Sequence, residues 1–204
     1  MKLILASNNA HKLREFKELT QGLDLEIISQ KEAGLNLDVD ETGTTFEENA
    51  FLKADAVTRL TGLPAVSDDS GLAVDALDGA PGIYSARYGY GHDASDEQRN
   101  EYLLSQLGER TDRTARYVCA VCCTFPNGDV ITTRGECEGS ILFSPRGKGG
   151  FGYDPLFAPA DLAEGDDRTM AELRPEEKNA ISHRGKAMRA LVEALKNYTE
   201  KSGD

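Results

Sequence analysis

The segment DDSG contains two adjacent carboxylates, Asp68 and Asp69, which could bind a metal ion or transfer a proton. Asp, Ser and Gly favour turns, so this segment predicts an acidic turn between two short apolar strands. Because side chains diverge along a turn, we expect one of the two carboxylates to enter a given site. With a second carboxylate, for which Glu41 in DETG is the candidate, it would suit Mg²⁺, which takes oxygen ligands beside substrate phosphates. A plain surface turn is the alternative.

The polar loop SNNAHK at residues 7–12 is a candidate phosphate site. It lies between a strand-like apolar run and a helix, so free backbone N–H groups and the positive end of the helix dipole converge there. A cation in the first helical turn, as at Lys12, is unfavourable unless an anion neutralises it, although the spacing is not that of a P-loop. The alternative is that Ser7 or Asn9 only caps the helix and that Lys12 is solvated.

Aromatic and basic side chains gather in two further segments. FGYD at residues 151–154 offers two rings among glycines, where a planar base could approach the backbone and stack, but both rings could equally be packing residues. The final helix carries Lys178 and then SHRG at residues 182–185, a positive cluster for which a solvated helix face is the alternative. Taken together, the acidic, basic and aromatic sites suggest a pocket for a magnesium nucleotide.

The cysteines at positions 119, 122, 123 and 137 are expected to be buried and inert. Cys119 and Cys122 lie in a strand-like run, where residues three apart point to opposite faces, so their spacing does not make a zinc knuckle. No export signal precedes the first strand, which favours a reducing, cytosolic compartment.

Helices are expected to alternate with strands along the chain. The first strand covers residues 3–6, and the helix after it has Leu13, Phe16 and Leu19 on one face and ends near Gly22. Two more helices begin at capping pairs, Thr45 with Glu48 and Ser95 with Gln98, and the second of these ends at Gly108.

The second half of the chain predicts an antiparallel hairpin and one long helix. Strand runs at residues 117–125 and from Val130 are joined by PNGD, which contains the strongest short-range hairpin signal. Residues 78–93 are rich in Gly and Pro and predict a long surface loop, and Pro175 suits the first turn of a helix that runs to about Asn197. Helices interleaved with mixed strands indicate an α/β or α+β domain.

Length and charge narrow the class of protein. A chain of 204 residues is expected to form one domain, or one domain with a small lobe, and it can bury a core without a disulfide or metal staple. No apolar run approaches a membrane span. The net charge of -12 argues against binding a nucleic-acid polymer through a broad basic face, so an anionic ligand must be small and locally held.

The motifs together resemble the inosine triphosphate pyrophosphatase family, whose members are also called XTP/dITP diphosphatases. They occur in that family's order and spacing over nearly the whole chain: SNNAHK, ETGTTFEENAFLKA, DDSGLAVDALDGAPGIYSARY, GGFGYDPLF and EEKNAISHRGKA. The resemblance implies an α/β fold with an elongated mixed sheet and flanking helices, in a single domain over residues 1–204 with two lobes and an active-site cleft between them. It also implies a homodimeric, cytoplasmic, Mg²⁺-dependent enzyme that hydrolyses ITP, dITP and XTP to the monophosphate and pyrophosphate and so cleanses the nucleotide pool.

The resemblance also implies a role for each matching residue. Asp69 would be the general base and a Mg²⁺ ligand, and Glu41 would assist the metal. The triphosphate would be held by Ser7, Asn8, Asn9, Ala10, His11 and Lys12. The remaining substrate contacts would come from Ser70, Phe151, Gly152, Tyr153, Asp154, Lys178, His183 and Arg184.

Elementary chemistry agrees with these roles. Asp69 should stay ionised at pH 7, because the reference pKa of an aspartate is about 3.9. A donor such as Arg184, aimed at the 6-oxo group of the base, would reject adenine, which carries a donor amino group there. Two rival functions are a nucleotide-sensing module without turnover and a triphosphatase or phosphatase that releases orthophosphate.

Overall fold

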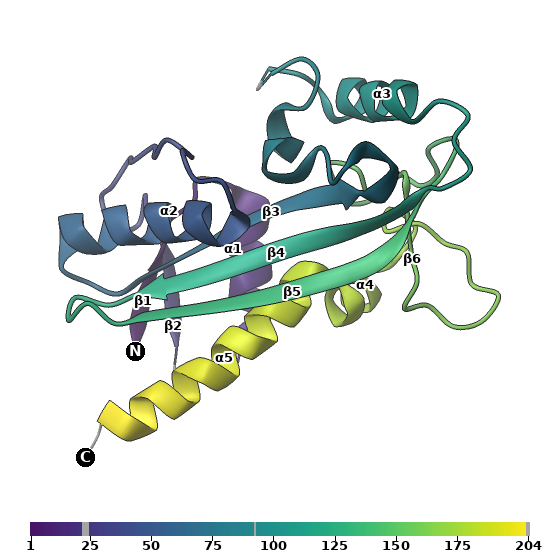
Figure 1. Ribbon diagram of the computed structural model, residues 1–204. Coiled ribbons are helices and arrows are strands. Elements are labelled where there is room, and N and C mark those ends of the chain that lie inside the picture. The colour runs from purple at the N-terminus through teal and green to yellow at the C-terminus, as the bar shows by residue number, and fades with distance from the viewer. Residues whose placement is uncertain (22–24, 92, 203–204) are drawn as a thin grey trace. The chain divides into compact units, whose positions relative to one another are not determined.

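The computed structural model describes residues 1–21, 25–91 and 93–202, and the side chains of His11, Leu19, Lys201 and Ser202 lie outside that description. Six strands form one mixed sheet in the order β2-β1-β3-β4-β5-β6 (Figure 1). Their bounds are β1 Lys2–Leu5, β2 Glu26–Ser29, β3 Ala65–Val74, β4 Thr114–Thr124, β5 Val130–Ile141 and β6 Phe157–Pro159. The predicted α/β class is therefore confirmed. Strands β2 and β6, each of four residues or fewer, were not expected from the sequence.

The chain divides into two compact units. Unit 1 comprises Met1–Asp69, Cys119–Gly135 and Gly185–Asp204, and unit 2 comprises Ser70–Val118 and Glu136–Arg184. The single domain with two lobes and a cleft stays a prediction, and each unit is described here by itself. No helix within the described ranges is long and apolar enough to cross a bilayer.

Unit 1 covers both faces of its strands with helices. β1 pairs in parallel with β2 and with β3. Successive strand residues point to opposite faces, so Leu3, Leu5 and Val66 pack with Phe16 of α1 (Ala10–Leu19) and Met188 of α5 (His183–Ser202). On the other face the buried cluster is formed by Ile4, Ala6, Ala65 and Val57, the last from α2 (Phe46–Thr61).

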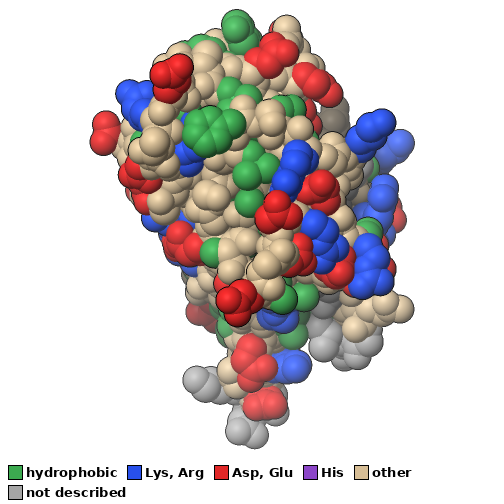
Figure 2. Space-filling view, turned by 90° about the vertical axis from the view of Figure 1, so that its right-hand side faces the viewer, with side chains coloured by type: hydrophobic (Ala, Val, Ile, Leu, Met, Phe, Trp, Pro, Cys, Tyr) green, Lys and Arg blue, Asp and Glu red, His purple; other side chains and the backbone are tan. Residues whose placement is uncertain are grey.

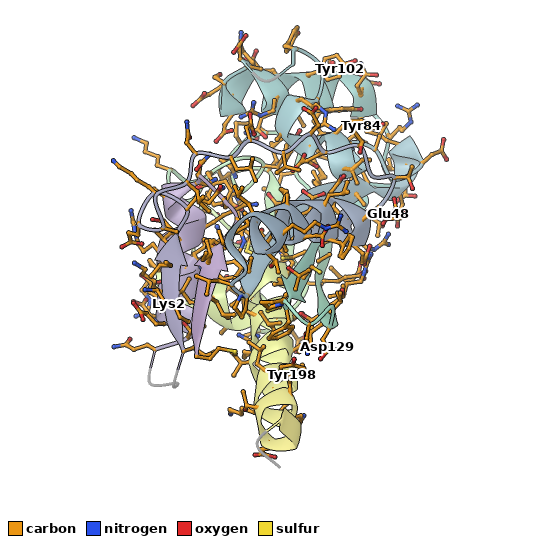
Figure 3. All side chains as sticks on the ribbon, turned by 90° about the vertical axis from the view of Figure 1, so that its left-hand side faces the viewer. Lys2, Glu48, Tyr84, Tyr102, Asp129 and Tyr198 are labelled. Carbon is orange, nitrogen blue, oxygen red and sulfur yellow. The ribbon has the colours of Figure 1, made fainter. Side chains whose placement is uncertain are left out.

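The β4–β5 turn is held against α5 in unit 1. Phe125 N–H donates to the carbonyl of Asp129, and so short a connection between neighbouring strands makes the predicted hairpin antiparallel. Tyr198 of α5 stacks on Phe125 with ring centroids 4.2 Å apart and donates to Asp129 at 2.9 Å (Figure 3). The hairpin tip and the end of the chain therefore stabilise each other.

Unit 2 is built on α3 (Asp96–Leu107), α4 (Pro175–Ile181) and the outer parts of β3, β4 and β5. Its core contains Leu72, Leu103, Tyr117 and Phe157. The predicted capping box of Ser95 and Gln98 is present in full at the start of α3. That of α2 is half present, because Thr45 accepts from Glu48 N while the Glu48 carboxylate accepts from Thr44 instead.

The prediction that DDSG forms a turn is wrong. The segment lies inside β3, which continues without interruption from Ala65 to Val74. β1 ends at Leu5, opposite Val66, so the DDSG part of β3 continues as a strand along its other neighbour, β4, and this outweighs the turn preference of Asp, Ser and Gly. Asp68 and Asp69 are consequently buried on opposite faces of the sheet.

Two other predictions need correction. The single helix expected from Pro175 to about Asn197 is broken at Ser182, which is extended (φ -64°, ψ 150°), so α4 ends there and α5 begins at His183. Serine is favoured at the residue before a helix, which explains the new start. The surface loop at residues 78–93 contains the 3-10 helix Gly82–Arg87, in which Ser85 is buried and its hydroxyl accepts from Leu72 N.

The prediction that the cysteines are buried is confirmed. All four are free thiols with no exposed surface. Cys119 and Cys123 belong to the core beneath α5, whereas Cys122 contacts Thr132, and Cys119 and Cys122 thus serve different faces of β4. Burial raises the pKa of Cys123, which keeps it a neutral thiol at neutral pH.

Candidate active site

The loop between β1 and α1 lines a pocket of unit 1. Asn9 caps α1, because its Oδ1 accepts from Lys12 N at 3.2 Å, and Ser7 Oγ accepts from Asn9 N at 3.2 Å. The first turn of α1 holds no acidic residue, so no carboxylate of the helix itself offsets its positive end. The pocket has a volume of about 560 Å³ and is lined by Ser7, Asn8, Asn9, Ala10, Leu13, Ser29, Lys31, Leu35 and Asn36.

Lys12 is not a solvated side chain. Its ammonium lies 3.0 Å from Asp68 Oδ1, and the Lys12 side chain is only 17% exposed. Asn9 therefore caps the helix, as the alternative predicted, but Lys12 is not solvated, although that alternative expected it to be. His11 is part of the α1 backbone, and its side chain lies outside the described part of the chain.

Asp69 lies beside Lys53 on the α2 face of β3. Lys53 Nζ is 3.6 Å from Asp69 Oδ1 and 2.6 Å from Glu41 Oε1, and Asn49 donates to Asp69 Oδ2 at 3.2 Å. The ammonium thus holds together the two carboxylates that the family resemblance assigns to the metal. With Asp68 and Lys12 added, three carboxylates and two ammonium groups give the cluster a net charge of -1.

The pKa of Asp69 is raised above its ordinary value. Burial is the largest cause, and Glu41 adds repulsion, while Lys53, Lys12 and the hydrogen bond from Asn49 oppose the rise. The attraction of Asp69 and its neighbouring carboxylates raises the pKa of Lys53 despite its burial. A carboxylate with a raised pKa accepts a proton more readily than an ordinary one, which suits a general base.

Glu41→Gln is expected to move the acid limb of the pH profile of kcat/KM to lower pH. In the role of general base that the family resemblance assigns to Asp69, only its ionised carboxylate can accept a proton, so activity falls as the pH drops through its pKa. Glu41 raises that pKa by repulsion, and glutamine removes the repulsion. The position of the limb, measured from the rate of nucleotide hydrolysis, checks this even where Glu41→Gln also lowers the maximal rate. An acid limb of Glu41→Gln that stays at the wild-type pH or moves to higher pH contradicts the prediction.

Asn49 and Lys53 are functional candidates that sequence reasoning missed, although both lie in a quoted motif. They are four residues apart on α2 and so share one face of that helix. The sequence could have indicated them, because both lie beside the buried apolar positions Phe46, Ala50 and Ala54, where solvent-exposed polar residues are not expected. No periodicity could show that they face a strand carboxylate.

Unit 2 brings together the predicted aromatic and basic residues. Phe151 has the ammonium of Lys178 at 5.1 Å and the guanidinium carbon of Arg184 at 5.6 Å from its ring centroid. Lys178 Nζ also lies 2.7 Å from Asp154 Oδ2, and Arg184 is only 5% exposed. The solvated helix face considered as an alternative is therefore wrong for these two cations.

Asp154 holds its own loop in place. Its Oδ2 accepts from Phe151 N at 2.9 Å, and Tyr117 Oη lies 3.4 Å from its Oδ1. The close approach requires Gly150, where an added Cβ would lie 2.0 Å from Asp154 Oδ2 and where φ is +70°. Burial raises the pKa of Tyr117 well above its ordinary value, so the hydroxyl stays protonated.

The remaining predicted residues occupy defined places. His183 is buried and stacks on Tyr117, with ring centroids 4.7 Å apart and an angle of 12° between the rings. Tyr153 is a buried packing residue whose hydroxyl donates to the carbonyl of Ser85 at 2.9 Å. Ser70 follows Asp69 on β3 and is half-buried.

Comparison with known proteins identifies the family. The model of the Ham1 family matches residues 3–194. A protein of Exiguobacterium sp. named dITP/XTP pyrophosphatase is 49% identical over 191 residues, covering 94% of this chain and 95% of its own length. One of Deinococcus deserti with the same name is 48% identical, covering 96% and 89%.

A solved structure agrees with this match. The Ham1 protein of Staphylococcus aureus superimposes with a TM-score of 0.87 at 42% identity, over 97% of this chain and 100% of that protein. The resemblance drawn from the sequence motifs is therefore confirmed, and the chain belongs to the Ham1 family.

Proposed function

We propose that the protein hydrolyses dITP, XTP and ITP to the nucleoside monophosphate and pyrophosphate. The observation that carries the proposal is the buried Asp69 with a raised pKa, paired with Lys53 and Asn49. Such a carboxylate serves proton transfer, and a protein that only binds nucleotides gains nothing from it. The names of the relatives, dITP/XTP pyrophosphatase, support the same reaction.

In the proposed reaction Asp69 accepts a proton from the attacking water. The water oxygen bonds to phosphorus, the bridging bond between the α- and β-phosphates breaks, and the nucleotide leaves as monophosphate and pyrophosphate. Lys53, 3.6 Å from Asp69, keeps the carboxylate ionised between turnovers, and Asn49 fixes its orientation through the 3.2 Å hydrogen bond. The proton is released to solvent when the products leave.

Mg²⁺ is the proposed cofactor, and Glu41 and Asp69 would hold it. Within the described ranges no group of three or more His, Cys, Asp or Glu side chains is placed to hold a metal ion. Two hard carboxylates fit an ion that completes its shell with water and substrate phosphates, as Mg²⁺ does. The cluster carries a net charge of -1, so a triphosphate needs further cations there. When bound, the ion neutralises phosphate charge and polarises the phosphoryl group.

The phosphates are proposed to bind at the β1–α1 loop, and Lys12→Ala tests this. Loss of a charged donor should weaken dITP and inorganic tripolyphosphate by about 10- to 100-fold, while inosine monophosphate, which lacks the β- and γ-phosphates, changes far less. The KM of dITP and the competitive inhibition constants of tripolyphosphate and inosine monophosphate measure these effects. Lys17→Ala is the matched control, because this exposed lysine of α1 pairs with Glu32. Equal weakening of all three ligands places Lys12 elsewhere in the site.

The purine is proposed to bind at Phe151 in unit 2, beside Lys178 and Arg184. Arg184 would donate to the 6-oxo group that hypoxanthine and xanthine share. Acidic and basic side chains are mixed over the face shown in Figure 2, and that face offers no continuous basic surface for a nucleic-acid polymer.

Product analysis decides between this function and its rivals. Incubation of dITP with the protein and Mg²⁺ should release pyrophosphate and the monophosphate in equal amounts. Orthophosphate as the first product indicates a general triphosphatase, and binding without turnover indicates a nucleotide sensor. Chelation of divalent ions should abolish the pyrophosphate release, and added Mg²⁺ should restore it.

We also propose that the enzyme works in the cytoplasm as a homodimer. The four free, buried thiols suit a reducing compartment. Tyr84, Tyr90 and Phe143 of unit 2 are large exposed rings of the kind enriched in protein interfaces. Sedimentation equilibrium measures the oligomeric state directly.

A further inference from the structure

Two side chains of helix α3 bind the backbone N–H and the backbone carbonyl of Gly152, in the aromatic segment at residues 151–154. Asp96 Oδ2 accepts from Gly152 N–H at 2.6 Å, and Asn100 Nδ2 donates to the Gly152 carbonyl at 3.1 Å. Asp96 and Asn100 are four residues apart, so they project from the same face of the helix. One helix face therefore fixes the backbone between Phe151 and Tyr153.

The Asp96 carboxylate is itself held in position. Arg99 lies 2.5 Å from the other carboxylate oxygen of Asp96, and the same guanidinium donates to the carbonyl of Ala94 at 2.5 Å. The capping box of Ser95 and Gln98 fixes the helix start immediately before it. Asp96 therefore presents its second oxygen to Gly152 in one defined direction.

Asn100 is retained at a cost in stability. It is only 7% exposed, and its Oδ1 is a buried acceptor with no hydrogen-bond donor in the part of the chain that the structure describes. A buried acceptor without a donor destabilises the folded state, and an apolar side chain of similar size would avoid that cost. The bond from Asn100 Nδ2 to Gly152 is thus better explained by function than by stability.

The conformation of Gly152 is not imposed by crowding around it. Its φ is +63°, a conformation that favours glycine, yet a Cβ added there would meet no atom within 4 Å. The glycine leaves the peptide free to rotate in the unfolded chain and in a loosened loop. The two bonds from α3 select one of those conformations, and together with the bond from Phe151 N to Asp154 Oδ2 they set where the Phe151 ring lies.

We propose that Asp96 and Asn100 are positioning residues, which hold the Gly152 peptide so that Phe151 meets the purine in a productive arrangement. The inference rests on the proposed function, in which Phe151 stacks on the base. Neither residue need touch the substrate, because both act through the backbone of the segment. Their effect should therefore fall on the base end of the nucleotide and leave the phosphate end unchanged.

The test compares Asp96→Ala and Asn100→Leu with a matched control, Glu97→Ala, which removes an exposed carboxylate from the same helical turn. Misplacing Phe151 should raise the KM for dITP by about tenfold or more, while the inhibition constant of inorganic tripolyphosphate, which has no base, stays within about twofold. Asp96→Asn should recover most of the loss, since its amide oxygen can accept the same hydrogen bond, and it keeps the test open where Asp96→Ala fails to fold.

Amide exchange over residues 149–156 gives a readout that needs no turnover. Exchange should become faster in Asp96→Ala and Asn100→Leu and stay as in the wild type in Glu97→Ala. If wild-type protein releases no pyrophosphate from dITP, the proposed function fails, and the exchange rates still decide whether α3 positions the segment. Unchanged exchange in both variants, or an equal rise for dITP and tripolyphosphate, overturns the inference.

Discussion

Asp69→Asn should lower kcat for dITP by at least about 100-fold, the loss that removal of a general base typically causes. Asparagine is nearly isosteric, and Asn49 can still donate to its side-chain oxygen as it does to Asp69 Oδ2. What disappears is the charge that accepts a proton from water. Steady-state kinetics with pyrophosphate release as the signal measures the change.

The raised pKa of Asp69 predicts that this variant folds well. The pKa of Asp69 is higher in the folded protein than in the unfolded chain. The folded protein therefore becomes less stable as the pH rises from the unfolded pKa to the folded one. At neutral pH the ionised Asp69 therefore costs stability, and neutral asparagine removes that cost. The melting temperature of Asp69→Asn should equal or exceed that of the wild type.

Asp68→Asn is the matched comparison, because it changes the neighbouring carboxylate on the opposite face of β3. Asp68 contacts Lys12 at 3.0 Å, so its loss should alter the KM through the phosphate loop and leave kcat within about tenfold. Activity of Asp69→Asn within tenfold of the wild type would falsify the role of Asp69 as the base. A change confined to KM would make it a binding residue.

Arg184→Ala should lower the preference for dITP over dATP by about 10- to 100-fold in kcat/KM. A hydrogen bond from a charged donor contributes about 1.5–3 kcal/mol, and dATP, whose amino group never accepted that bond, loses little. Arg184 is buried, and its guanidinium carbon lies 5.6 Å from the centroid of the Phe151 ring, on which the base is proposed to stack. Parallel measurement of kcat/KM for both nucleotides gives the ratio.

Two companion variants separate base recognition from loss of charge. Arg184→Lys keeps the charge but not the planar donor pair, and it should retain part of the preference. Arg189→Ala removes an exposed arginine of α5 and should change neither value. If Arg184→Ala reduces both substrates equally and leaves the ratio unchanged, Arg184 contacts the phosphates, and base selection belongs to the Phe151 segment.

The elements that the sequence predicted correctly are those with strong local signals. Thr45 and Ser95 begin helices where their capping pairs indicated, and PNGD joins two strands. These features depend on residues a few positions apart, which is the range that capping and turn rules cover.

The break at Ser182 was missed because the apolar spacing continues past it, although serine is favoured before a helix start. The other errors arose where distant parts of the chain override local preference, as where DDSG continues as a strand of the sheet. Lys53 escaped notice for a related reason. Its partners Glu41 and Asp69 are 12 and 16 residues away along the chain, and no periodic pattern connects them.

The continuity of β3 makes the chemistry of this region sensitive to chain length. Adding or deleting a single residue between Ala65 and Asp68 would exchange the faces of all later positions in the strand. Asp69 would then face Phe16 and α5, and the base would be lost although every residue type remained. Length changes are therefore expected to be excluded from these few positions during divergence.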